Sequence, residues 1–269
     1  MKNTFCVLLL AALLPASGQG LLEPFGTRYQ LLAALAPSFS NASVIDHNPA
    51  ALGSITRFNA SVQGERRFLL KELSAYALQA ALPLANATAA AGLAVAGHPG
   101  WQERSLRAAY ARRLGARASL GIGAQWLQAG NGTYGRASAL TASAGFRWEL
   151  APSVHAGLAL SNPARVRFGK GSEERLPATY SLGVGWQHEA QWMLALALLQ
   201  RDGHPPCVVA GAEYVFARAL RARCGIDTGA PSAWIGLGTI AAAMRIDVTV
   251  TLHRELGATP LLQLTYPAQ

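Results

Sequence analysis

The sequence predicts an all-β protein, an antiparallel transmembrane β-barrel of about 14 strands. The composition is 51% hydrophobic but only 14% charged, whereas soluble domains carry roughly 25% charged residues. No uninterrupted apolar run reaches the roughly 18 residues that a transmembrane helix needs. After residue 53, apolar and small polar residues alternate with a period of two, which places them on opposite faces of strands. An apolar surface built from alternating strands is typical of an outer-membrane barrel.

The first 18 residues are expected to be a secretory signal peptide. Lys2 supplies the positive start, Phe5 to Leu14 form a short apolar run, and Ala16-Ser17-Gly18 is a small-residue cleavage site. Cys6 lies inside the run, so it is not a lipoprotein anchor. An exported barrel is expected to be an integral protein of the Gram-negative outer membrane.

The basic excess of the chain has two readings. Removing Lys2 leaves 22 Lys and Arg against 14 Asp and Glu, a net charge of about +8. A basic excess can indicate nucleic acid, but an exported chain rarely meets any, so we expect no nucleic-acid partner. We interpret the arginines as lumen residues or as contacts to the phosphates of outer-membrane lipids.

Residues 19–53 differ from the rest of the chain. Pro24, Pro37 and Pro49 interrupt any regular pattern. The segment is therefore either a periplasmic leader or a plug inside the barrel. Residues 54–269 are expected to form the barrel itself.

The clearest alternation runs from Met244 to Arg254, where Met244 and Val248 share one face while Arg245 and Asp247 share the other. Turn signals between such segments divide the chain into fourteen expected strands. They are 55–64, 67–81, 87–97, 103–113, 117–128, 136–149, 152–162, 178–188, 190–201, 207–216, 219–227, 232–240, 243–254 and 258–266. The alternative is a soluble β-sandwich adhesin or lectin with the aromatic residues in its core. The polar faces favour a barrel, because they are rich in Gly, Ser, Ala and Thr and too poor in charge for a solvated surface.

One hairpin predicts a charge pair in the lumen. A turn centred near Ala217 and Arg218 places Glu213 opposite Arg221, with Arg223 as a diagonal neighbour. These three residues occupy alternate positions whose side chains point inward, and so do Arg245 and Asp247 on their own strand. Mutual pairing of charges inside a barrel is the structural interpretation, and a gating or ligand contact is the alternative.

The two remaining cysteines are expected to stay unbonded. Their strands are neighbours, but Cys207 shares parity with Glu213 and faces the lumen, whereas Cys224 alternates with Arg223 and faces lipid. Directly opposed residues share a face, so a disulfide would need a bulge between them.

The sequence carries little that suggests catalysis. It has no Gly-x-Ser-x-Gly elbow, and its six histidines are dispersed without metal-ligand spacing. Asp46, beside His47, is interpreted as a turn-capping residue. We therefore expect no enzyme, no cofactor and no metal, although a barrel enzyme is the least favoured alternative.

Several short elements resemble the FadL-like family of outer-membrane proteins. The first comprises Asn48, Pro49, Ala50 and Leu52 and is similar to the family's Asn-Pro-Ala-x-Leu element. The second half resembles the PorV/PorQ branch more specifically, in elements that follow in order to Tyr266. They are Ser161-Asn162-Pro163, Leu176-Pro177, Tyr180-Ser181-Leu182-Gly183, Gly211-Ala212-Glu213-Tyr214, Leu220 to Gly225, Gly236-Leu237-Gly238, Ile246-Asp247 and His253 before Leu256-Gly257. The chain departs from the branch in its short length and in Arg223 and Cys224, which are inserted before Gly225.

The resemblance implies a fourteen-stranded barrel whose N-terminal segment, residues 19–53, folds into the lumen as a hatch. It also implies two possible functions. A PorV/PorQ-like protein would assist protein export by type IX secretion, with the translocon or cargo proteins as partners. A FadL-like channel would take up long-chain fatty acids or other hydrophobic compounds, through a lateral opening for which Gly92, Gly145, Gly157 or Gly185 would supply the strand kink. The more specific resemblance of the second half favours the export function.

Overall fold

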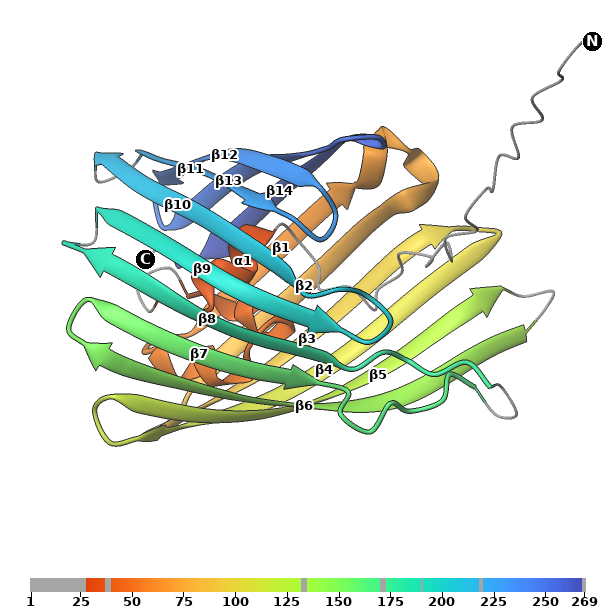
Figure 1. Ribbon diagram of the computed structural model, residues 1–269, viewed down its shortest axis with the longest axis horizontal. Coiled ribbons are helices and arrows are strands. Elements are labelled where there is room, and N and C mark those ends of the chain that lie inside the picture. The colour runs from red at the N-terminus through yellow and green to blue at the C-terminus, as the bar shows by residue number, and fades with distance from the viewer. Residues whose placement is uncertain are drawn as a thin grey trace, which may run out of the picture.

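The computed structural model is a closed antiparallel barrel of fourteen strands in which each strand pairs with its sequence neighbours and β1 pairs with β14 (Figure 1). It describes residues 28–36, 40–131, 135–169, 173–189, 191–217 and 220–267. The signal peptide expected at residues 1–18 lies outside this range. The strands are β1 Asn59–Arg66, β2 Ser74–Pro83, β3 Ala87–His98, β4 Trp101–Leu114, β5 Ala118–Asn131, β6 Gly135–Ala151, β7 Val154–Ser161, β8 Thr179–His188, β9 Trp192–Arg201, β10 Cys207–Ala217, β11 Leu220–Asp227, β12 Ser232–Ala241, β13 Met244–His253 and β14 Gly257–Tyr266.

The predicted fold class is confirmed, and closure excludes the β-sandwich. Twelve of the expected strands match closely, but the first two are shifted. β1 starts at Asn59, because Pro49–Ser54 forms a 3₁₀ turn (η3) that leads into it. β2 starts at Ser74, because two further 3₁₀ turns, η4 Arg67–Leu69 and η5 Lys71–Leu73, occupy the connection after β1.

The two ends of the barrel differ in their connections. β1 begins and β14 ends at the same end, where the connections between strands are two or three residues long. The opposite end carries the longer loops, including the 17 residues between β7 and β8. Short turns on the periplasmic side and longer extracellular loops are usual in outer-membrane barrels. We name these the short-turn end and the long-loop end.

The outer face of the barrel is apolar. Its exposed side chains include Leu93, Leu106, Ile122, Leu140, Leu158, Leu182, Leu196, Ile235, Val248 and Leu262. The inward residues of the same strands are smaller or polar, such as Ala109, Thr141 and Thr249, and they are buried. Alternation therefore sorts the side chains as the sequence predicted. Trp234, near the start of β12, is a large aromatic residue that points inward and is 2% exposed.

The interior of the short-turn end is filled by the described part of the hatch, which consists of α1 Arg28–Ala33, η2 Ala42–Asp46 and η3 (Figure 1). Leu32 and Leu35 pack against Met193, Val209 and Trp234 of the wall. A second set on the hatch, Val44, Ile45, Leu52 and Ile55, packs against inward alanines of β2, β3 and β4 at positions 81, 90, 109 and 111. Because the wall presents alanine here, the hatch can lie close to the strands and bury its own larger side chains.

On β5 to β8, the inward positions that face the hatch are occupied by glycine, which is smaller still than alanine. A Cβ added at Gly121 would overlap the backbone of Pro49 and Ala50, and one at Gly145 would overlap the side-chain oxygen of Asn48. A Cβ at Gly157 would lie 2.5 Å from a Leu35 methyl carbon. Gly185 also lies against Leu35. These glycines therefore allow the hatch to lie close to the strands. At their positions, the strands β5–β8 remain paired without interruption.

We expect Gly145→Val to displace the hatch, because the added side chain needs the space that Asn48 occupies. Limited proteolysis of the purified barrel in detergent measures this, since a displaced segment is cut faster. Ala144→Val is the matched control, because residue 144 points outward on the same strand. Equal cleavage rates in the two variants would contradict the close packing described here.

Candidate functional site: the lumen and its hatch

A cluster of buried charges lies on the inner wall of β10, β11 and β13. Glu213 is within ion-pair distance of three guanidinium groups, at 3.6 Å from Arg221, 3.5 Å from Arg223 and 3.6 Å from Arg245. Asp247 pairs with Arg223 and, at 2.7 Å, with Arg245. All five side chains are at most 6% exposed. Three cations and two anions leave one positive charge in a site where water is scarce.

The predicted register of this hairpin was wrong by two residues. Glu213 stands opposite Arg223, and Arg221 stands opposite Val215. The main cause is the position of the turn, because Ala217 pairs with Leu220 and the turn therefore follows Ala217 instead of being centred near it. One extra residue in β10 between Val215 and Ala217 shifts the register back by one position, which places Glu213 opposite Arg223.

Glycines on β12 make room for this cluster. Gly236 pairs with Arg223 and Thr249, and Gly238 pairs with Arg221 and Asp247. A Cβ at Gly236 would lie 2.9 Å from the Cγ of Arg223, and one at Gly238 would lie 2.8 Å from the Cγ of Arg221. The arginine side chains therefore cross the surface of β12 and reach the carboxylates on either side.

Tyr29 of the hatch closes the cluster from the lumen side. Its hydroxyl donates a hydrogen bond of 2.5 Å to Glu213 Oε2, and the guanidinium of Arg223 lies 4.1 Å from the centre of its ring. Burial and the neighbouring carboxylate of Glu213 raise the pKa of Tyr29, so the phenol stays protonated and keeps its donor role. The contact joins the hatch to β10 and β11.

Gln30, the next residue, joins the hatch to the seam between β1 and β14. Its amide nitrogen donates to Gln63 Oε1 at 2.7 Å and to Gln263 Oε1 at 3.0 Å. Gln263 in turn donates to Ser61 at 2.9 Å. Buried amides are stable only where they are hydrogen-bonded, so this network fixes both the hatch and the strand closure.

The Asn-Pro-Ala element has a local and a tertiary role. Asn48 caps η3 by accepting a hydrogen bond of 3.0 Å from the backbone of Ala50, and Pro49 occupies the first position of that turn. Ala50 and Leu52 are fully buried. The carbonyl of Ala50 accepts a hydrogen bond of 2.8 Å from Ser119 on β5. The motif thus sets the position of η3 against β5 and β6.

Asp46 is not a capping residue, contrary to the sequence interpretation. It forms an ion pair with Arg107 of β4 and accepts a hydrogen bond of 3.2 Å from Gln79 of β2. Burial raises the pKa of the Asp46 carboxyl and Arg107 opposes this rise, so the charged form depends on the ion pair. The turns are capped instead by Asn41 and Asn48.

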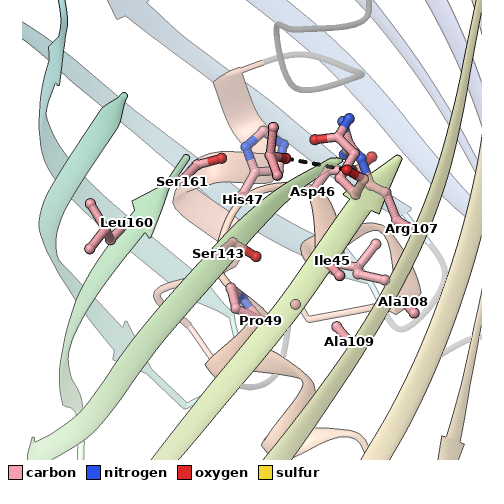
Figure 2. A pocket seen from close by; sticks show the side chains of 14 residues that line it. Ile45, Asp46, His47, Pro49, Arg107, Ala108, Ala109, Ser143, Leu160 and Ser161 are labelled. Carbon is pink, nitrogen blue, oxygen red and sulfur yellow. Dashed lines mark hydrogen bonds and ion pairs between the residues drawn. The ribbon is translucent and has the colours of Figure 1, made fainter. Parts of the chain in front are cut away.

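A pocket borders this ion pair on the side of the lumen (Figure 2). It contains about 410 Å³ of space not filled by atoms, part of it open to solvent. Its lining comes from the hatch, through Ile45 to His47 and Pro49, and from β4, β5, β6 and β7. A smaller space of about 220 Å³ lies between the hatch and β7–β9 and includes Asn48 in its lining.

Part of the interior near the long-loop end is apolar. Leu176 of the β7–β8 loop packs against Leu127, Ala139, Ala75 and Ala77, with Val166 and Phe168 of the same loop beside them. Two contacts hold the loop in this position. Asn162 donates to the carbonyl of Leu176 at 2.7 Å, and Arg165 pairs with Asp202 through bonds of 2.5 and 2.8 Å. Those bonds from Arg165, with a further one from the backbone of Ala178, lower the pKa of Asp202.

The remaining sequence predictions concern cysteines, metals and helices. No disulfide joins Cys207 and Cys224, and Cys224 is exposed opposite Ala212, as the parity argument predicted. In the described residues, no group of three or more His, Cys, Asp or Glu is arranged to hold a metal ion. No helix in the same residues is long and apolar enough to cross a membrane, a result that does not bear on strands.

Sequence reasoning missed Tyr29, Gln30 and Arg107. A signal existed only for Arg107, whose inward neighbours on β4 are the small residues Ser105 and Ala109. A guanidinium at such a position needs an acidic partner, and Asp46 of the hatch supplies it. Tyr29 and Gln30 precede the regular pattern, so nothing in their spacing indicates what they contact.

Solved structures of a FadL homologue and of two toluene transporters have the same fold as this chain. A Pseudomonas aeruginosa FadL homologue superimposes with a TM-score of 0.63 at 12% identity, covering 87% of this chain and 95% of that one. The Pseudomonas putida toluene transporter TodX gives 0.63 at 11%, with 85% and 94% covered. The Ralstonia pickettii toluene transporter TbuX gives 0.62 at 12%, with 92% and 99% covered. No family model and no curated protein matches the sequence. The chain has a FadL-like fold.

We expect Tyr29→Phe to loosen the hatch, because it removes the hydrogen bond to the buried Glu213 carboxylate and keeps the aromatic ring. A hydrogen bond to a charged group contributes about 1–3 kcal/mol, which corresponds to an increase of roughly 5- to 150-fold in the equilibrium for local opening. Hydrogen exchange of the amides in 28–36 measures this change. Tyr266→Phe, at an exposed residue on β14, is the control and should leave the exchange unchanged.

Proposed function

We propose that this protein is an integral outer-membrane channel for small hydrophobic compounds. The observation that carries the proposal is an apolar part of the interior near the long-loop end, where Leu127 and Ala139 of the wall pack against Leu176. A water-filled porin has a polar interior. A hydrophobic solute gains free energy when it leaves water for an apolar wall, so this lining suits such a solute.

The location in the outer membrane is part of the same proposal. The outward faces of the strands expose large aliphatic side chains all around the barrel, and a surface of this kind is stable only against lipid. The FadL homologue, TodX and TbuX share the fold, and two of them are described as toluene transporters. Hydrocarbons are therefore the first compounds to test. The proposed channel has no catalytic step and no cofactor.

The hatch is the proposed barrier of the channel. It is held by a few directional contacts, Tyr29 to Glu213, Gln30 to Gln63 and Asp46 to Arg107, rather than by covalent links. Each contact joins the hatch to a different part of the wall. Rearrangement of the hatch would open the short-turn end without any change in strand pairing.

Uptake measurements test the channel directly. A strain that lacks the gene should take up radiolabelled toluene more slowly, and the wild-type gene should restore uptake. Leu127→Asp places a charge in the apolar lining and should leave uptake at the level of the deletion strain. Leu127→Met keeps the lining apolar and should restore uptake. Unchanged uptake in the deletion strain would refute the channel.

A PorV/PorQ-like role in type IX secretion stays a prediction. One observation favours it: two elements of that resemblance are joined in space, because Asn162 donates to the carbonyl of Leu176 and so shapes the β7–β8 loop at the rim. A shaped rim loop is a suitable surface for a translocon or for cargo proteins.

Proteomics of the culture medium separates the two functions. If the protein assists export, deletion should leave proteins that share one C-terminal secretion domain in the periplasm. Asn162→Ala should then fail to restore export, because it removes the hydrogen bond that shapes the β7–β8 loop. An unchanged set of secreted proteins in the deletion strain would remove the export role.

A further inference from the structure

The residues that line the pocket beside the Asp46–Arg107 ion pair limit the class of substrate that the pocket can bind. Figure 2 shows Asp46 and His47 of the hatch on one side and Arg107, Ser143 and Ser161 of the wall around them. It lies between the hatch and the wall of β4–β7, so a solute that moves along the lumen would meet it.

The cation in this pocket is already neutralised. Arg107 forms an ion pair with Asp46. With the Gln125 amide oxygen turned toward it, Arg107 also donates from Nε at 3.0 Å and from Nη2 at 2.8 Å. Asp46 is held on its other side by Gln79. Of the residues that line the pocket, Asp46 and Arg107 are the charged pair, and their formal charges cancel. An anion would therefore have to break a buried ion pair to bind Arg107.

Uncharged polar groups remain for a ligand. Ser143 and Ser161 stand opposite each other in the β6–β7 ladder, and both line the pocket. Gly123 beside them has no side chain, and a Cβ there would lie 2.6 Å from the Ser143 hydroxyl. Hydroxyl groups donate and accept hydrogen bonds, so they match an alcohol or a carbonyl oxygen. Ile45 of the hatch provides apolar surface in the same lining.

We propose that this pocket binds hydrophobic molecules whose polar end is an uncharged hydroxyl or carbonyl group, and that the Asp46–Arg107 pair excludes carboxylates and other anions. The proposal rests on the proposed channel and names the substrate class that its pocket favours. The selecting residue is Asp46, since it cancels the one guanidinium in the lining. The hydroxyls of Ser143 and Ser161 supply the contacts that orient the ligand.

Benzyl alcohol and benzenesulfonate are the probes, because they share the aromatic ring and differ in the charge of the polar group. Binding to the purified full-length barrel in nanodiscs is measured by calorimetry at pH 8. Empty nanodiscs correct for partition into lipid. The wild-type protein should bind benzyl alcohol and not benzenesulfonate. Ser143→Ala should weaken benzyl alcohol binding about three- to tenfold, which is the effect of one neutral hydrogen bond.

Charge variants give the decisive comparison. Asp46→Asn leaves Arg107 without its counter-charge, so benzenesulfonate should now bind at least tenfold more tightly than to the wild type. The double variant Asp46→Asn/Arg107→Gln is neutral again and should return to the preference for the alcohol. Asp202→Asn, at a carboxylate paired with Arg165 outside the pocket, should behave as the wild type. Heat-dependent mobility on gels verifies that each barrel is folded.

Two outcomes would overturn the proposal: tighter binding of benzenesulfonate than of benzyl alcohol by the wild type, or the same preference in the wild type and Asp46→Asn. Failure of the channel is a separate result. If the binding preference and its reversal hold but deletion leaves uptake unchanged, the pocket is real and the transport function is wrong. If deletion slows uptake but the preference is absent, the channel stands and its substrate class lies elsewhere.

Discussion

The carboxylate of Glu213 and the phenol of Tyr29 meet inside the barrel, where neither can be solvated freely. A buried carboxylate is costly unless cations and hydrogen-bond donors surround it. Here three arginines come from neighbouring strands, and the fourth partner, Tyr29, comes from the hatch. The position of the hatch and the electrostatics of the wall therefore depend on each other. The contacts of Gln30 and Asp46 also join a buried polar side chain of the hatch to the wall, but they involve fewer charged groups.

A second constraint is the size of the inward side chains. A fourteen-stranded barrel encloses more space than its own small inward residues fill. Alanine on β2–β4 and glycine on β5–β8 keep that space open, and the hatch occupies it with leucine, isoleucine and valine. The hatch and the wall thus form a single packed interior at the short-turn end. Toward the long-loop end the β7–β8 loop contributes the apolar residues instead.

The division of polar and apolar groups explains how one lumen can serve transport. Fixed polar contacts hold the hatch in place at a few positions, and the apolar surfaces between them give little directional preference. A solute with a large apolar part and a small neutral polar group matches both the apolar surfaces and the polar positions. The buried excess of positive charge around Glu213 lies behind Tyr29, and the charges beside the pocket cancel. Selectivity in the proposed channel therefore depends on pairing of charges more than on their number.

The sequence alone determined the barrel, because period-two alternation over more than two hundred residues can be satisfied only by strands with two different environments. It also determined which face each residue takes, including Arg245 and Asp247 inside and Cys224 outside. The tertiary structure decided the rest. The pairing of Glu213 with Arg223 depends on an irregular residue in β10, and local sequence does not reveal a shift of register. The partners of Tyr29, Gln30 and Asp46 lie on strands far along the chain, and only closure of the barrel around the hatch brings them into contact.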